Sequence, residues 1–81
     1  MQSADSMREL RPGESGVVRR LLLNGSMRRR LLDLGLVEGT EVECLGRSPG
    51  GDPSAYLVRG AVIAIRAEDG RKVLIERRGD G

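Results

Sequence analysis

The chain has 81 residues, which is enough for one small domain and little more. It contains no histidine and a single cysteine, Cys44, so an internal disulfide is excluded and a structural zinc site is not expected. The formal net charge is only +2, and because neither a signal peptide nor an apolar segment of membrane-spanning length is recognised, the sequence predicts a soluble cytoplasmic protein.

Alternating apolar and polar residues predict five short strands after a polar start. Residues 1–6 are expected to be frayed, residues 7–10 to form one turn of structure, and Pro12-Gly13 to make a tight turn. The predicted strands are residues 17–23, 40–45, 55–59, 62–66 and 73–77. In the first strand the apolar residues do not alternate regularly. Two sets are therefore possible for its buried face: Val17, Leu21 and Leu23, or Val18 and Leu22. In the later strands the residues expected to share a face are Val42 and Cys44, Tyr56 and Val58, and Val73 and Ile75.

A short amphipathic helix is predicted between the first two strands. Ser26 suits its N-cap, because the hydroxyl can accept a hydrogen bond from a backbone N–H of the first turn. Gly35 supplies the left-handed residue at which many helices end. A helix this short needs support from the rest of the fold. The residues expected to pack it are Met27, Leu31 and Leu34, with Leu36 folding back over the same face.

Turn residues separate the strands. Residues 47–53 (RSPGGDP) predict an exposed loop, Gly60 a close connection, and Asp69-Gly70 a hairpin turn. Short strands with one short helix predict a mainly β fold, a small barrel of about five strands with the helix inserted after the first. Closure into a barrel would remove the unpaired strand edges.

Several short motifs together resemble the ferrous-iron transport protein A (FeoA) family over residues 7–77, which leaves flexible ends at 1–6 and 78–81. The motifs are residues 10–13 (LRPG), 29–36 (RRLLDLGL), 39–42 (GTEV), 51–53 (GDP), 58–60 (VRG) and 63–66 (IAIR). The resemblance implies an SH3-like barrel and a cytoplasmic accessory protein of bacterial ferrous-iron uptake. The implied partner is the membrane transporter FeoB, which carries a GTPase domain. The barrel also resembles the C-terminal module of repressors of the diphtheria-toxin-repressor type. Glu38 departs from the family pattern, where proline is expected before Gly39, and this makes the turn less rigid.

Three consecutive arginines, Arg28, Arg29 and Arg30, lie in the first turns of the predicted helix, where the helix dipole disfavours positive charge. One interpretation is a solvated face with a weak pair between Arg29 and Asp33. The other is a surface for the carboxylates or phosphates of a partner, since arginine suits bidentate pairing. The predicted partner-binding residues are the three arginines together with an outward apolar residue, Leu57 or Leu22.

Metal and catalytic sites are predicted to be absent. Cys44, Glu43 and Asp52 are the weak candidates for metal ligands, but no recognised ligand spacing is present, and Cys44 fits a buried thiol better. No tightly bound cofactor is therefore expected, while a transient or surface divalent metal stays open. Without histidine or an activated nucleophile, the sequence does not predict an enzyme.

Two other kinds of binding module stay open beside a transport accessory. One is a nucleic-acid-binding barrel, which the arginines favour; the low net charge and the single aromatic residue, Tyr56, count against it, so no nucleic acid is expected. The other is a regulatory module of a metal-dependent repressor. A weak homo-oligomer formed through free strand edges is also left open.

Overall fold

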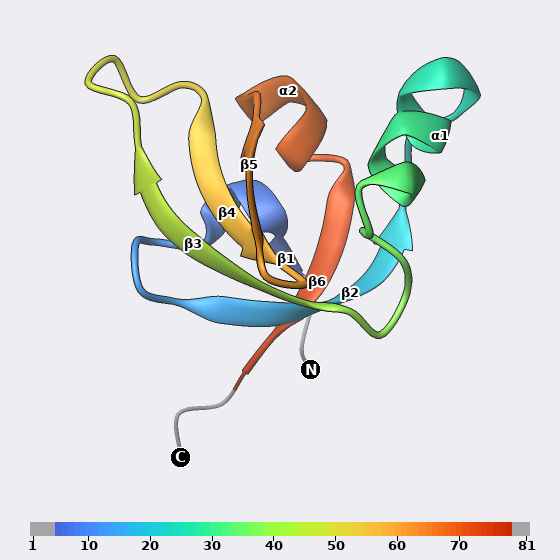
Figure 1. Ribbon diagram of the computed structural model, residues 1–81, viewed down its shortest axis with the longest axis horizontal. Helices are drawn as coiled ribbons and strands as arrows, with labels where there is room; N and C mark the ends of the chain where they lie inside the picture. Colours follow the sequence, from blue (N-terminus) through green and yellow to red (C-terminus); the bar gives the residue numbers. More distant parts are fainter. Residues whose placement is uncertain (1–4, 79–81) are drawn as a thin grey trace.

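Six strands of one antiparallel sheet dominate the structure, a computed structural model that describes residues 5–78 (Figure 1). The elements are β1 (Asp5–Ser6), η1 (Met7–Glu9), β2 (Ser15–Leu21), α1 (Gly25–Asp33), β3 (Glu41–Arg47), β4 (Ser54–Val58), β5 (Ala61–Ile65), α2 (Ala67–Gly70) and β6 (Val73–Arg77). The expected mainly β class, with a short helix after the first long strand, is confirmed. Within the described range, no helix has the length and apolar character needed to cross a membrane.

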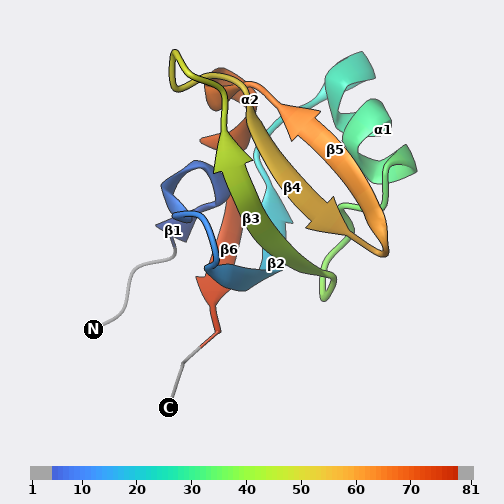
Figure 2. The same cartoon turned by 60° about the vertical axis from the view of Figure 1, so that its left-hand side comes forward.

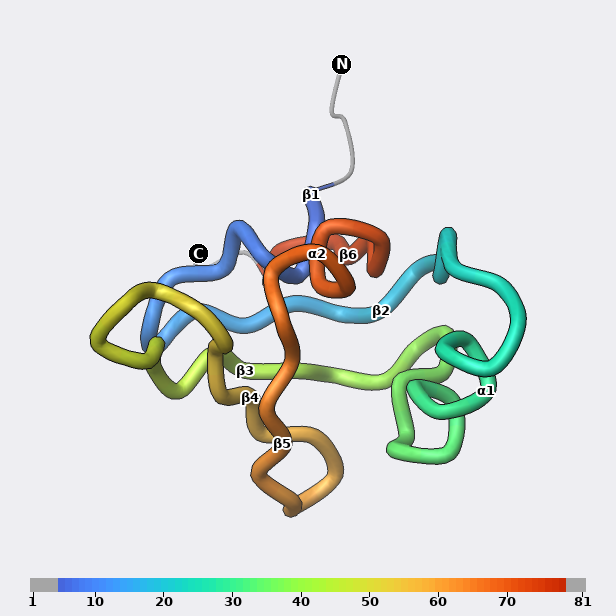
Figure 3. Tube along the Cα trace, turned by 90° about the horizontal axis from the view of Figure 1, so that it is seen from above, coloured from blue at the N-terminus to red at the C-terminus, as the bar shows by residue number. Residues whose placement is uncertain are grey.

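The sheet curls around its core and stays open on one side. Its strand order is β1-β6-β2-β3-β4-β5, so β1 and β5 are the two edges (Figure 2). The pairing register shifts between Val18 and Arg20 in β2 and between Cys44 and Gly46 in β3, and such bulges bend and twist strands. η1 follows β1, α2 follows β5, and the two helical turns contact each other beside the ends of these edge strands (Figure 3).

The core fills the concave side of the sheet. The bulge in β2 explains why its sequence period is imperfect: Val18 is fully buried, Leu22 is 52% exposed, and Leu23 turns inward after the strand has ended. The facing pairs expected in the later strands are confirmed. The buried apolar side chains are Met7, Leu10, Val18, Leu23, Leu31, Leu36, Val42, Cys44, Tyr56, Val58, Ile65, Val73 and Ile75.

η1 is tied to the sheet by side chains from β3 and β4. The hydroxyl of the buried Tyr56 donates to the Met7 carbonyl at 3.3 Å, and burial raises the pKa of this phenol. The guanidinium of Arg47 donates to the carbonyls of Arg8 and Leu10 at 3.1 and 3.0 Å. The turn of structure expected at residues 7–10 is thus confirmed as a 3-10 turn fixed in place.

Helix α1 ends as predicted but begins and packs differently. Gly35 has φ +104, its N–H bonds the Leu32 carbonyl at 2.9 Å, and the N–H of Leu36 bonds the Leu31 carbonyl at 3.0 Å. This is a Schellman motif, which brings Leu36 into the core. The prediction that Ser26 is the N-cap is wrong, because the helix starts at Gly25. Leu34 was expected on the packed face, but it is 37% exposed because the helix has already ended there and Leu36 occupies that part of the core.

The predicted hairpin at Asp69-Gly70 is wrong. These residues belong to α2, a single helical turn. β5 and β6 lie at distant places in the sheet order, so the chain must cross between them instead of reversing. The carboxylate of Asp52, from the loop between β3 and β4, accepts the Ala67 N–H at 2.7 Å and satisfies one of the free donors of that turn.

The residues expected to be loose at the N-terminus include a strand. Asp5 and Ser6 form β1 against β6, whereas residues 1–4 lie outside the described range, as do residues 79–81 of the expected tail. Arg77 of β6 holds this end of the sheet together. Its guanidinium contacts the Asp5 carboxylate at 2.7 Å and the Glu14 carboxylate at 2.6 Å.

The stability of the fold is expected to depend on pH through Glu14. Hydrogen bonds from the Arg11 backbone N–H and then from Arg77 hold the pKa of this carboxyl below its ordinary value of 4.5. Because the folded-state pKa is lowered, the contribution is complete above pH 4.5 and is lost as the pH falls through the lowered pKa. The melting temperature of the Glu14→Gln variant should therefore fall less steeply below pH 4.5 than that of the parent chain.

Thermal unfolding followed by circular dichroism across this pH range measures the difference. Glu38→Gln is the matched control, because Glu38 is exposed and makes no side-chain hydrogen bond or ion pair among residues 5–78. This control should retain the parent slope. Equal slopes for the Glu14→Gln variant and the parent would contradict the assignment.

Candidate functional site

The exposed surface of α1 carries an excess of positive charge, three arginines against Asp33. Arg28, Arg29 and Arg30 are exposed, and no ion pair within residues 5–78 includes any of them. The weak pair between Arg29 and Asp33, which belonged to one of the two interpretations, is not formed. The first turn contains no acidic residue, and no side chain caps it. We call these three arginines the arginine face; consecutive residues point about 100° apart around a helix, so the three spread over more than half of its circumference.

A shallow hollow of about 430 Å³ borders the arginine face. Its lining residues are Gly25, Arg28, Arg29, Leu32 and Asp33. The half-buried Leu32 gives the hollow an apolar wall, while the guanidinium groups present planar donors that pair bidentately with carboxylates. An acidic segment with one apolar side chain matches this chemistry.

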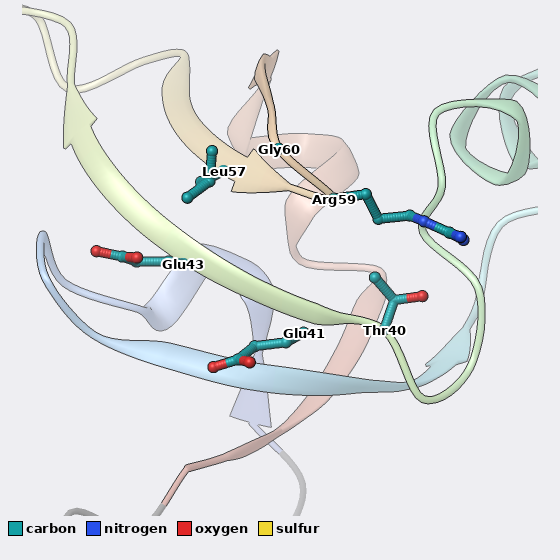
Figure 4. A pocket seen from close by; sticks show the side chains of 6 residues that line it. All are labelled: Thr40, Glu41, Glu43, Leu57, Arg59 and Gly60. Atoms are coloured by element: carbon teal, nitrogen blue, oxygen red, sulfur yellow. The ribbon is translucent and has the colours of Figure 1, made fainter.

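A second hollow, of about 390 Å³, lies on the outer surface of β3 and β4 (Figure 4). It is lined by Thr40, Glu41, Glu43, Leu57, Arg59 and Gly60. The half-buried Leu57 lies opposite Glu43 in the strand register and forms the apolar part of the lining. Glu41 also pairs with Arg78 at 3.5 Å. We call this set the strand hollow.

Arg59 lies between the strand hollow and the chain segment that follows α1. It occupies the two-residue turn between β4 and β5 with φ 52, and Gly60 follows with φ 84. Its side chain runs from the strand hollow toward the end of α1, where a Cβ built on Gly35 would lie 2.9 Å from the Arg59 Cδ (Figure 4). Our sequence prediction missed Arg59. The signal was there, since an arginine in a tight Arg-Gly turn is held at the end of a hairpin.

The predicted partner-binding residues are divided between two hollows: Arg28 and Arg29 line the hollow on α1, Leu57 lines the strand hollow, and Arg30 lines neither. The arginine face belongs to α1, whereas Leu57 belongs to the strand hollow. Leu22, the other outward residue considered, is exposed just after β2, and its N–H bonds the Lys72 carbonyl at 2.7 Å. Arg59 lines the strand hollow with Leu57 and lies beside Gly35, which follows α1.

The weak metal-ligand candidates do not converge. The Cys44 thiol is buried in the core, as expected, while Glu43 lies on the opposite face of the same strand. Asp52 is already engaged with the Ala67 N–H. In the part of the chain that the structure describes, no three His, Cys, Asp or Glu side chains are grouped so that they could hold a metal ion.

Comparison with known proteins agrees with this architecture. A FeoA domain family model matches residues 6–77. The "Fe(2+) transport protein A/Fe(2+) transporter FeoB fusion protein" of Porphyromonas gingivalis is 31% identical over 68 residues, which are 84% of this chain but only 8% of that relative. The chain therefore spans less than a tenth of the curated relative that it matches.

Two solved structures share the fold. The FeoA-like protein of Clostridium acetobutylicum superimposes with a TM-score of 0.88 at 27% identity, covering 100% of this chain and 94% of that one. FeoA of Stenotrophomonas maltophilia, crystallised with zinc and described as a prokaryotic SH3-domain protein, gives a TM-score of 0.74 at 32% identity, with 88% of each chain covered. The expected SH3-like class is confirmed, and the chain belongs to the FeoA domain family.

Proposed function

We propose that this protein is a non-enzymatic accessory domain of ferrous-iron uptake that docks on the cytoplasmic part of the transporter FeoB. Membership in the FeoA family and the fusion of a related domain to FeoB in one relative support this partner. The observation that carries the docking surface is the arginine face, three neighbouring arginines without an acidic partner in residues 5–78. Positive charge is unfavourable in the first turns of a helix, and unfavourable local features of this kind tend to mark functional sites.

The docking surface is completed by Arg59 and Leu57. The guanidinium of Arg59 extends the positive charge of α1 toward the strand hollow, and Leu57 offers apolar area beside it. Interfaces of this kind combine arginine anchors with apolar contacts. By docking, the domain would modulate the assembly of the transporter or its GTPase-linked transport. Iron is the cargo of the transporter in this proposal, and the domain needs no tightly bound cofactor.

Binding to the purified cytoplasmic domain of FeoB, with and without guanine nucleotide, tests the proposal. The variant with Arg28→Glu and Arg30→Glu is expected to raise the Kd by about tenfold or more, since like negative charges then face the acidic segment of the partner. Its melting temperature should stay close to that of the parent, because both side chains are exposed and form no ion pair with another residue of 5–78.

A charge-matched control separates the surface from a general loss of positive charge. Arg11→Glu with Arg66→Glu changes the net charge by the same amount at exposed residues outside α1. This control should bind FeoB nearly as well as the parent. Equal weakening by the two double variants would remove the arginine face from the proposal, and no binding of the parent chain would refute FeoB docking itself.

A further inference from the structure

The free edge of the sheet at β5 is uncharged and open. β5 reads Ala-Val-Ile-Ala-Ile and pairs with β4 in a regular register without a bulge (Figure 2). Val62 is 65% exposed, and Ala61 and Ala64 are exposed as well. Edge strands are usually protected by charges, proline, bulges or a covering element. β5 itself has no charge, proline or bulge, so it is open to pairing with another strand.

The hydrogen-bonding pattern of the hairpin fixes which groups face outward. Val58 and Ala61 flank the two-residue turn, and residues in that place exchange both backbone hydrogen bonds. Bonded residues alternate along an antiparallel pair, so Ala61, Ile63 and Ile65 bond β4. The N–H and C=O groups of Val62 and Ala64 therefore point away from the sheet.

We infer that this edge pairs with the β5 edge of a second copy of the chain, antiparallel and about a two-fold axis at Ile63. In that register, Val62 of each copy lies opposite Ala64 of the other, so every outward backbone group of the two strands forms a hydrogen bond. The same register places the two Ile63 side chains opposite each other on the inner face. Two-fold pairing of one surface with itself is the commonest way to build a dimer.

The charges at the ends of β5 are complementary in the same arrangement. Arg59 precedes the strand, while Arg66, Glu68 and Asp69 follow it. Antiparallel pairing brings Arg59 of one copy beside the other three residues of the second copy, so each end of the pair sums to zero charge. None of these four side chains forms an ion pair within the described chain. A strand of another protein that carries a net charge at its ends would not bring each end of the pair to zero charge.

The dimer should be a weak one. A five-residue strand pair buries much less than the roughly 1,000 Å² that stable interfaces need, so we expect dissociation at micromolar concentration and pairing toward about 1 mM. The pairing uses the backbone edge of β5 and not the arginine face, and Arg59 is the residue that it shares with the proposed FeoB surface. The Val62→Lys and Ala64→Pro variants leave Arg59 unchanged, so they separate the two proposals.

Sedimentation equilibrium and amide chemical shifts of the full chain, measured on dilution from about 1 mM, test the pairing. A concentration-dependent dimer is expected, with shifts concentrated at Val62 and Ala64. Val62→Lys should raise the dimer Kd by about tenfold or more, since an edge lysine opposes strand pairing. Ala64→Pro should do the same, because it removes an outward N–H while sparing the bonds to β4.

Leu45→Lys is the matched control. Leu45 is 42% exposed and belongs to β3, an inner strand, where it lines an outer-face hollow together with Ala64. This lysine therefore places the same charge on the outer face of the sheet and not on the β5 edge strand, and should leave the backbone pairing intact. A parent chain that stays monomeric would refute the inference. Equal loss of dimer in the Leu45→Lys variant would also overturn it, by assigning the contact to the outer face of the sheet. Shifts of the β5 amides caused only by the FeoB domain would assign the edge to a strand of the transporter.

Discussion

Replacement of Leu31 by alanine is expected to lower the free energy of unfolding by about 2–5 kcal/mol. Leu31 is 2% exposed and is the only side chain of α1 that is fully in the core. Its carbonyl also accepts the N–H of Leu36 at 3.0 Å, so the cavity would open where the helix end is fixed to the sheet. Because a domain of this size has little stability to spare, much of the protein should be unfolded at 37 °C.

Urea unfolding followed by circular dichroism measures this effect. Leu34→Ala is the matched control, since it makes the same substitution at a 37% exposed residue directly after the helix. The control should change the free energy of unfolding by about 1 kcal/mol or less. A similar loss in both variants would mean that α1 also packs through Leu34, as expected from the sequence.

Local patterns predicted the parts of the fold that depend on neighbouring residues. The alternation of Val42 and Cys44 with glutamates, and the position of Gly35 after an apolar helix face, each follow from the geometry of one element. The bulge after Val18 was visible only as a broken period, because a bulge is fixed by the partner strand and not by the sequence around it.

Long-range order explains the errors. Asp69-Gly70 has the composition of a hairpin turn, but the sheet order separates β5 from β6 and Asp52 stabilises a helical turn there instead. The candidate site shows the same division between features that depend on local sequence and features that depend on long-range contacts. The unusual charge of the arginine face was evident in the sequence, whereas the place of Arg59 between α1 and Leu57 depends on how the hairpin and the helix end meet.

This meeting point gives a second prediction with a large effect, because Gly35 cannot be replaced without strain. Its φ of +104 disfavours any side chain, and an alanine Cβ would lie 2.9 Å from the Arg59 Cδ and 3.6 Å from the Val58 Cγ1. We expect Gly35→Ala to lower the free energy of unfolding by about 1–3 kcal/mol. It should also displace Arg59, and so weaken binding to FeoB if the proposed surface is correct.

Gly39→Ala separates backbone strain from the contact with Arg59. Gly39 has φ +92, but nothing lies within 4 Å of a Cβ built there. Alanine at this position therefore costs only the free energy of holding a positive φ, without a steric contact. Gly39→Ala should therefore destabilise the fold without weakening FeoB binding, whereas Gly35→Ala does both. Combining Gly35→Ala with Arg59→Ala should destabilise by less than the sum of the single changes, since the second removes the side chain that the first displaces. Strict additivity in urea unfolding would show that the Arg59 side chain does not press against the end of α1.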